Sequence, residues 1–340
     1  MNRPVTIYND RPRRDIHGNI VDAHEVCLEI FEGRFYLYGT AYGANSGFTK
    51  DNRIVCYSSP DLTEWTPHGV VAPAWDQGLV ARPAVKYSPK LGKYVLWFTA
   101  RNFVVGLAGR PEGPFEYLPD PPSTRFDRSG DFNLFVDDDG SAYLISAITF
   151  SRDPGQNHHI YIERLTDDLL NGTGEVCGPI AVNCEAPDLF RQGDLYYALF
   201  DNTCCFCPAG SGVRVYTASS PLGPFTYRGN INRRHDADPR QIQSFDDDTE
   251  PGEGRCDVII PAQQAHVTRL PTTDGDRLIW IGDRWGSADD GVKGYDYTYW
   301  SSPLEFEPDG MIRRLRWEPS WDCNLQLDQA ENFAPAATEA

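Results

Sequence analysis

The stretch EVCLEIFEGRFYLYGT (residues 25–40) has the pattern of a β-hairpin. Apolar side chains alternate with others from Val26 to Ile30, Glu32-Gly33 follows, and an aromatic run comes next. Alternation with a period of two predicts a strand, and a glycine between two such runs predicts a tight turn. The stretch therefore predicts two antiparallel strands, and His24 and Glu25 lie where the first of them begins.

The same pattern recurs along the chain. An acid or amide near a strand start is followed by an alternating strand, a turn and an aromatic strand. The other copies are RPAVKYSPKLGKYVLWFTA from Arg82, DFNLFVDDDGSAYLISA from Asp131, EAPDLFRQGDLYYALFD from Glu185 and QQAHVTRLPTTDGDRLIWIGDRW from Gln263. Self-similarity of this kind is the mark of a repeat architecture.

A second element closes each unit with a strand, a turn of small residues and proline, and an aromatic. It occupies residues 54–69, 104–118, 213–229 and 297–310, and residues 159–174 replace it in the third unit. Five units of about four strands predict an all-β, five-bladed β-propeller in a single domain. A β-sandwich, the alternative, predicts no such recurrence. We place the propeller at residues 15–322, between an N-terminal segment (1–14) and a C-terminal tail (323–340).

In a propeller the innermost strands of all blades line one central channel, so their starts converge at one mouth. Those starts lie near Glu25, Arg82, Asp131, Glu185 and Gln263. Three of the five are carboxylates, and crowding like charges raises the energy. Folding alone does not explain such crowding, so we infer chemistry or a bound cation at this mouth.

The net charge of −18 argues against a partner such as nucleic acid or an anionic membrane, since binding to either needs clustered Lys and Arg. The N-terminal residues carry no apolar signal-peptide core, so a cytoplasmic location is expected unless a leader was removed. Among the nine cysteines, the run CCFC (204–207) suggests a metal cluster. It lacks a second pair of ligands at zinc spacing, which favours ordinary buried thiols.

These motifs resemble glycoside hydrolase family 43, and most closely its exo-β-1,3-galactanase-like branch. The resemblance is carried by RPAVKYSPKLGKYVLWF, DFNLFVDDDGSAYLI, EAPDLFRQGDLYYALF and IGDRW, and it extends over about residues 15–322. It implies an inverting, exo-acting hydrolase that releases a terminal galactose, arabinose or xylose type of sugar from plant-type oligosaccharides. No cofactor is expected to be required.

The resemblance also implies three catalytic acids. Glu185 matches the general acid, and Asp131 matches the aspartate that raises the pKa of that acid. Counting back from the aromatic pair Phe35-Tyr36 assigns the general base to Glu25. The galactanase-like branch has Ala-His-Gly at this point, and the resemblance implies that it uses a glutamine, which Gln263 matches. Either Glu25 or Gln263 therefore activates the water.

Two departures from the branch keep other functions open. Ala81 stands where the branch tends to have a glutamate, and SAITFSRDP (146–154) differs from the segment usual there. One alternative is a propeller that binds sugar without cleaving it. The other is a glycoside phosphorylase, which would need a larger set of cations than His24 and Arg82.

Seven residues are assigned to the mouth or the channel beside the three acids. His24 is a candidate for binding a sugar hydroxyl, and Arg82 for pairing with acids or touching substrate. Gln263, Asp283, Arg284 and Trp285 come from the fifth unit, where Trp285 stacks on a sugar or packs in the core. By the same resemblance, His266 is a candidate ligand of a structural calcium in the channel. The acidic run FDDDTEPGEG (245–254) lacks the spacing of a calcium loop.

Overall fold

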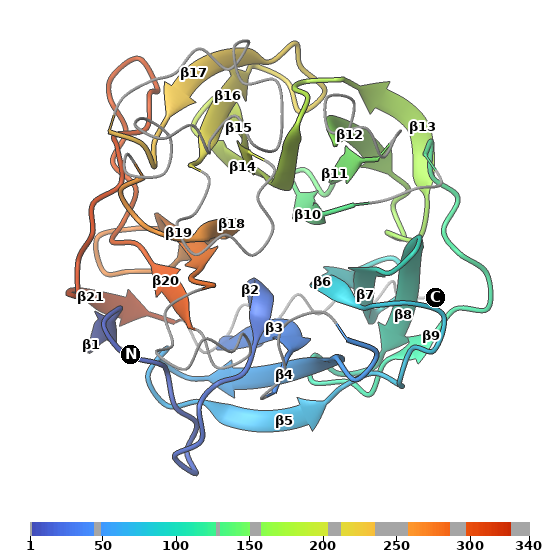
Figure 1. Ribbon diagram of the computed structural model, residues 1–340, viewed down its shortest axis with the longest axis horizontal. Helices are drawn as coiled ribbons and strands as arrows, with labels where there is room; N and C mark the ends of the chain where they lie inside the picture. Colours follow the sequence, from blue (N-terminus) through green and yellow to red (C-terminus); the bar gives the residue numbers. More distant parts are fainter. Residues whose placement is uncertain are drawn as a thin grey trace, which may run out of the picture.

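Five antiparallel sheets surround a common centre in the computed structural model (Figure 1). The structure describes residues 2–43, 49–126, 130–149, 158–202, 212–234, 258–285 and 297–327, and every element among them is a β-strand. The predicted five-bladed β-propeller is therefore confirmed. None of its described elements is a helix of the length and apolarity needed to cross a membrane.

Four blades have four strands each, in the order of the sequence. Blade one comprises β2 (His24–Phe31), β3 (Arg34–Ala41), β4 (Arg53–Ser59) and β5 (Thr66–Val70). Blade two comprises β6 (Ala81–Ser88), β7 (Lys93–Thr99), β8 (Phe103–Ala108) and β9 (Glu116–Tyr117). Blade three comprises β10 (Phe132–Val136), β11 (Ala142–Ile148), β12 (His159–Leu165) and β13 (Gly172–Cys177). Blade four comprises β14 (Cys184–Gln192), β15 (Leu195–Asn202), β16 (Arg214–Ala218) and β17 (Thr226–Asn230).

The fifth blade departs from the expected four strands. It contains β18 (Gln263–Leu270), β19 (Arg277–Asp283) and β20 (Thr298–Trp300), and the described part of residues 297–310 supplies no fourth strand to it. A separate two-stranded sheet of β1 (Asn2–Tyr8) and β21 (Ser320–Gln326) lies beside β20 instead (Figure 1). The prediction of about four strands in a unit therefore holds for blades one to four, whereas blade five has three among the described residues.

Hydrogen bonds attach both ends of the chain to blade five. The Asn9 side chain donates to the Trp300 carbonyl at 2.8 Å and accepts from its N–H at 2.9 Å, while Trp321 donates its indole N–H to the same carbonyl. Strands β1 and β21 also contribute Val5 and Leu325 to the core between blades five and one. The boundaries at residues 14 and 323 stay a prediction, since strand pairing does not test independent folding.

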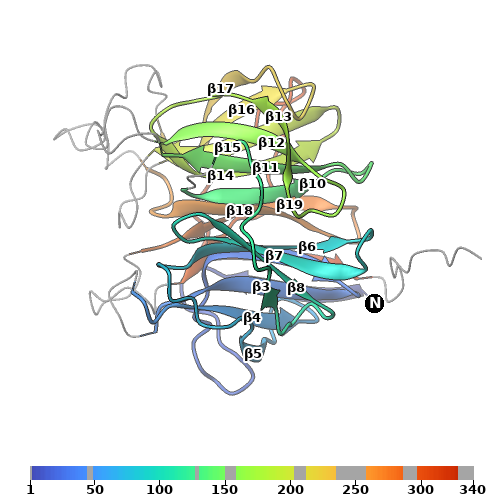
Figure 2. The same cartoon turned by 90° about the vertical axis from the view of Figure 1, so that its right-hand side faces the viewer.

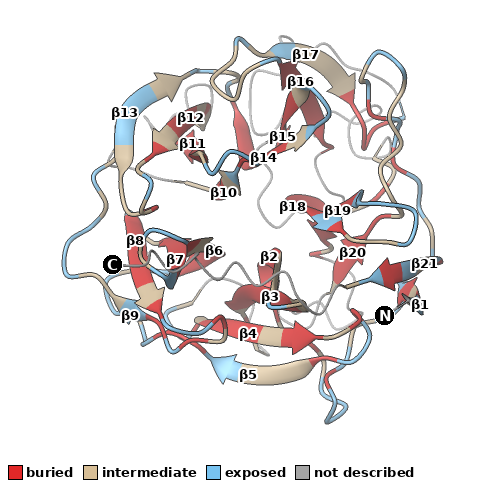
Figure 3. Ribbon diagram, turned by 180° about the vertical axis from the view of Figure 1, so that it is seen from behind, coloured by how far each residue is buried: buried red, intermediate tan, exposed pale blue. Residues whose placement is uncertain are grey.

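Burial follows distance from the centre of the ring. The inner strands are largely buried, whereas outer strands such as β5 and β13 have exposed residues (Figure 3). The side view shows the sheets stacked face to face (Figure 2). Aromatic side chains fill the layers between sheets, and Trp97, Trp280 and Trp300 are fully buried. This packing holds the inner strands in fixed register around the channel.

One glycine marks a close approach behind the mouth. A Cβ added to Gly39 of β3 would lie 2.7 Å from the Cβ of Ala23 and 2.9 Å from its Cα. Only glycine lets β3 lie this close to the residue that precedes β2. The position of His24 therefore depends on the missing side chain at Gly39.

Candidate active site

The inner strands of blades one, two and four begin with the same β-bulge. Cross-strand pairing shifts register directly after the pairs His24–Thr40, Ala81–Thr99 and Glu185–Asp201. The next residue has a positive φ in each blade: 54° at Glu25, 50° at Arg82 and 53° at Ala186. Non-glycine residues rarely adopt this conformation, and such residues concentrate at functional sites.

The bulges show that the residues inferred to start the inner strands do not all hold equivalent positions. Glu185 is the last paired residue before its bulge, and His24 holds the matching place in blade one. Glu25 lies one residue further along, where blade four has Ala186. Counting along the sequence aligned Glu25 with a catalytic position, whereas strand pairing aligns His24 with Glu185.

Carboxylates of one blade accept backbone N–H groups at the bulges of the next blade. The donor–acceptor pairs are Glu25 N to Asp283 Oδ2 (2.7 Å), Arg82 N to Glu25 Oε2 (3.1 Å), Ala186 N to Asp131 Oδ2 (2.9 Å) and Gln264 N to Asp201 Oδ2 (3.1 Å). Between blades two and three, Arg82 Nε lies 3.0 Å from Asp131 Oδ1. We call these contacts the rim network; they run through all five blades.

The rim network gives the acids a role in folding. Buried N–H groups need acceptors, and the bulges leave several without a strand partner. The inference that folding alone does not explain the clustered acids is therefore wrong for Glu25 and Asp131, and Asp283 accepts an N–H in the same way. A role in folding and a role in chemistry are compatible, because a carboxylate accepts more than one hydrogen bond.

Glu25 is the predicted general base, and its side chain is enclosed. It is 5% exposed, and its Oε2 also accepts from Thr40 Oγ1 at 3.1 Å. Burial raises the pKa of Glu25 from 4.5 to about 7, although the nearby Arg82 guanidinium opposes the rise. A carboxyl that titrates near neutrality has the basicity that a general base requires.

Arg82 is the cation that joins the acids of blades one and three. Although burial opposes its charge, the carboxylates of Asp131 and Glu25 raise the pKa of Arg82 above its usual value. Its terminal nitrogens lie 3.4 and 3.3 Å from the Gln264 carbonyl oxygen. Arg82 was predicted either to pair with acids or to touch substrate. These contacts show the pairing with acids.

His24 lies between two carboxylates and two aromatic rings. Its nitrogens lie 3.5 Å from Asp22 Oδ1 and 3.6 Å from Asp283 Oδ1, and its ring stacks on Tyr42 and Trp285 at 4.9 and 5.2 Å. Burial opposes protonation, but hydrogen bonds to the two carboxylates raise the pKa of His24 to about 10. The imidazole is therefore a cation at neutral pH.

Glu185 is linked to the fifth blade through Gln263. The Gln263 Nε2 donates to Glu185 Oε1 at 3.1 Å, and the Trp285 indole N–H donates to Gln263 Oε1 at 2.8 Å. Glu185 itself is 4% exposed, and His158 Nδ1 lies 4.0 Å from its Oε2. Trp285 thus orients the glutamine that contacts the predicted general acid.

Arg284 is the predicted site residue whose contacts lie away from the rim network. Its Nη1 donates to the Tyr297 hydroxyl at 2.8 Å, and its guanidinium lies 4.6 Å from the Trp317 ring centre. These contacts involve the outer part of blade five and the segment after it. The other predicted mouth residues meet at the rim.

Sequence reasoning missed Asp22, His158 and Asp201. Asp201 had a visible signal, because LYYALFD and LIWIGD both end an apolar strand with an aspartate, and the second of these is Asp283. His158 and Asp22 lie outside the repeated strands, in segments where no pattern predicts a position. Their contacts with His24 and Glu185 arise only from the fold.

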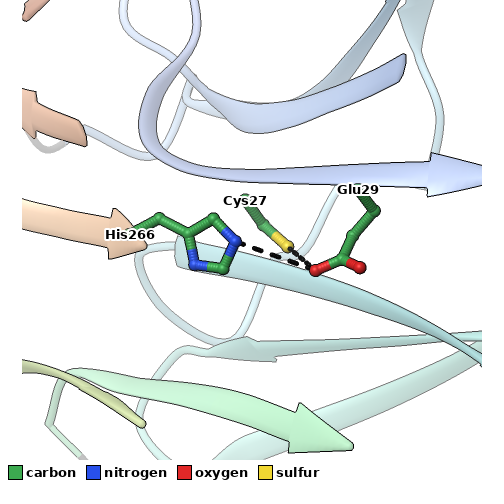
Figure 4. Close-up of side chains that lie close together, drawn as sticks. All are labelled: Cys27, Glu29 and His266. Carbon is green, nitrogen blue, oxygen red and sulfur yellow. Dashed lines mark hydrogen bonds and ion pairs between the residues drawn. The ribbon is translucent and has the colours of Figure 1, made fainter. Parts of the chain in front are cut away.

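His266 lies deeper in the channel, with Cys27 and Glu29 (Figure 4). One ligand atom of each lies within 4.8 Å of the others. Calcium prefers six to eight oxygen ligands, and this group offers one carboxylate, one thiol and one imidazole. The Lys86 ammonium already lies 2.5 Å from Glu29 Oε1 and would repel a second cation. These residues do not fit calcium.

A cavity of about 340 Å³ opens at that end of the channel. Glu29, Lys86, Asp188 and His266 line it, in the later parts of the inner strands. Glu185 and Glu25 lie at the starts of these strands, so the cavity is at the opposite end from the rim network. The cysteine run at 204–207 and the acidic run at 245–254 lie outside the described residues.

Comparisons with known proteins agree with this architecture. The model of "Glycosyl hydrolases family 43" matches residues 30–247. An arabinoxylan arabinofuranohydrolase of Bacillus subtilis is 28% identical over 279 residues, which cover 66% of this chain and 52% of that enzyme. The chain thus spans about half the length of this relative.

Two solved structures share the fold. An exo-β-1,3-galactanase of Phanerochaete chrysosporium with β-1,3-galactotriose has a TM-score of 0.72 at 23% identity, covering 95% of this chain and 68% of that one. A family 43 β-1,3-galactosidase with galactodeoxynojirimycin has a TM-score of 0.72 at 22% identity, covering 93% and 99%. At this level of identity the similarity shows the fold alone.

Proposed function

Because the chain belongs to glycosyl hydrolase family 43, we propose that it hydrolyses glycosidic bonds and releases a terminal sugar from plant-type oligosaccharides. The observation that carries the proposal is the rim network, which gathers Glu25, Asp131, Asp201 and Asp283 from four blades around Arg82. The relative named for arabinoxylan and the structures with galactose-type ligands support a terminal sugar of arabinose, xylose or galactose type.

Hydrolysis requires one acid to protonate the leaving oxygen while a base deprotonates water on the other face of the sugar. We assign the acid to Glu185, which lies buried beside Gln263. Asp131 accepts the N–H of the residue that follows Glu185, and its charge is balanced by Arg82. By the family resemblance, the Asp131 carboxylate would favour the protonated form of Glu185.

The water would give its proton to Glu25, while it attacks the anomeric carbon and the bond to the leaving oxygen breaks. In an inverting enzyme the two carboxyl groups lie roughly 6.5–9.5 Å apart so that water fits between them. Gln263 is the second candidate for orienting this water, because its amide already contacts Glu185. His24 and Trp285 are 1% and 2% exposed and stack on each other, so we propose that they hold the rim in place and do not touch the sugar.

The test is hydrolysis of arabino-, xylo- and galacto-configured aryl glycosides and oligosaccharides. Glu185→Gln should abolish release of the sugar from the unactivated oligosaccharides. The rate should fall by about 10³-fold or more, because no general acid would protonate the leaving oxygen. Glu175→Gln is the matched control, since Glu175 is 57% exposed on an outer strand. Sugar binding without turnover by the unchanged protein would contradict the proposal, and turnover that needs phosphate would indicate a phosphorylase.

A further inference from the structure

Asp201 is a buried acid that lies directly across the sheet from Glu185. It is the cross-strand partner of Glu185 near the end of β15, and it is fully buried. Side chains of directly opposed residues lie on the same face of a sheet, with Cβ atoms about 4.5–5.5 Å apart. Blade four therefore holds two carboxyl groups side by side at the rim.

Only one oxygen of Asp201 is used for the rim network. Its Oδ2 accepts the Gln264 N–H at 3.1 Å, and its Oδ1 has no hydrogen-bond partner within the described part of the chain. Blade five gives an internal comparison, because Asp283 accepts an N–H in the same way but lies opposite an amide, Gln263. Accepting the N–H therefore does not require a second acid across the strand.

Two adjacent buried carboxyl groups cannot both ionise at low cost. Burial and the neighbouring Glu185 charge raise the pKa of Asp201 well above its usual range, whereas Arg82 and the Gln264 N–H oppose the rise. Within the described part of the chain, the other charged and titratable groups near the pair are Asp131, His158, Cys184 and Arg214. Since Arg82 is shared with Glu25 and Asp131, it compensates this pair only in part.

We propose that Asp201 is a positioning residue of the reaction, because its carboxyl group shares one proton with Glu185 and so keeps the general acid protonated near neutral pH. The inference rests on the proposed function for its catalytic consequence. Glu185 would give this proton to the leaving oxygen as the glycosidic bond breaks. Glu25 would take one proton from the attacking water, and the other proton would stay on the new anomeric hydroxyl. At the end of the cycle Glu25 releases its proton to solvent and the pair regains one from solvent.

Asp201→Asn tests the inference, since the amide oxygen still accepts the Gln264 N–H and only the titratable group is lost. The alkaline limb of the kcat/KM profile should move to lower pH by about one unit or more. At neutral pH the hydrolysis rate of Asp201→Asn should fall strongly for unactivated oligosaccharides. It should fall little for dinitrophenyl glycosides, whose leaving group needs no proton. Asp188→Asn is the matched control, because Asp188 is also buried on β14 and accepts backbone N–H groups. The alkaline limb of the kcat/KM profile of this variant should not move.

An unmoved alkaline limb in Asp201→Asn, or equal losses on both kinds of substrate, would overturn the inference. Infrared pH titration gives a readout that needs no turnover. Because Glu25 also has a raised pKa, every infrared sample carries Glu25→Gln. In this background the otherwise unchanged protein should retain a protonated carboxyl band above the pH at which ordinary carboxyl groups ionise. Glu185→Gln and Asp201→Asn should each move the titration of the remaining partner to lower pH. Persistence of the same band in both variants would also overturn the pairing, and absence of hydrolysis by the unchanged protein would contradict only the proposed function.

Discussion

Replacing Glu25 with glutamine should change the pH dependence of stability in a defined direction. The pKa of Glu25 is raised from 4.5 to about 7 by burial, so the folded state holds a proton that the unfolded chain has released in this range. Folding then loses stability as the pH rises from 4.5 to 7. A rise of this size corresponds to roughly 3 kcal/mol, and no discount for solvent is needed because the residue is 5% exposed.

The glutamine variant has no proton to lose at this position. The free energy of unfolding of Glu25→Gln, relative to the unchanged protein, should therefore rise by about 3 kcal/mol between about pH 4.5 and pH 8. Urea unfolding at a series of pH values measures this difference. Glu64→Gln, at a side chain that is 67% exposed, is the control and should give a flat difference.

The same residue predicts a feature of the kinetics. If Glu25 is the general base, it must be ionised, so the acidic limb of kcat/KM should lie near pH 7. A stability difference that does not change with pH would refute the reasoning, because it would show that Arg82 fully compensates burial. An acidic limb well below pH 7 would instead favour Gln263 as the group that orients the water.

Two further variants test the surroundings of the rim. The raised pKa of His24, about 10, means that its interactions with Asp22 and Asp283 stabilise the fold fully below about pH 6.5 and are lost as the pH rises through about 10. The deficit of His24→Phe in thermal unfolding should therefore shrink over that range, and a constant deficit would contradict a charged His24. Gly39→Ala should cost about 1–3 kcal/mol, because its Cβ meets backbone at 2.9 Å. Gly109→Ala, with open space around the added atom, should be near neutral, and equal effects would contradict the close approach.

The sequence determined the architecture because the decisive signals are local. Alternation such as that of residues 25–40 needs only neighbouring residues to predict a hairpin, and five copies predict five blades. Glu185 and Asp131 were identified through motifs for the same reason. Among the described residues blade five has three strands, which local patterns did not predict. Beside it lie β1 and β21, which come from the two ends of the chain and pair only in the folded protein.

The sequence predicted which residues lie at the mouth of the channel, but it did not predict their positions relative to one another. Linear counting places Glu25 ten residues before Phe35, but a bulge inserts a residue and shifts every later position by one. Since successive strand residues face opposite sides, that shift decides which of His24 and Glu25 matches Glu185. The pKa values of Glu25 and His24 likewise depend on burial and on charges contributed by other blades.

What the sequence alone determined is therefore the blades, their order and the acids that stand near the strand starts. What only the tertiary structure decided is how these acids are used: which of them accept backbone N–H groups, which pair with Arg82, and which lie opposite another acid as Asp201 does. The physical reason is that strand patterns are fixed by neighbours along the chain. Electrostatic neighbours at the mouth come from five blades and exist only once the ring has closed.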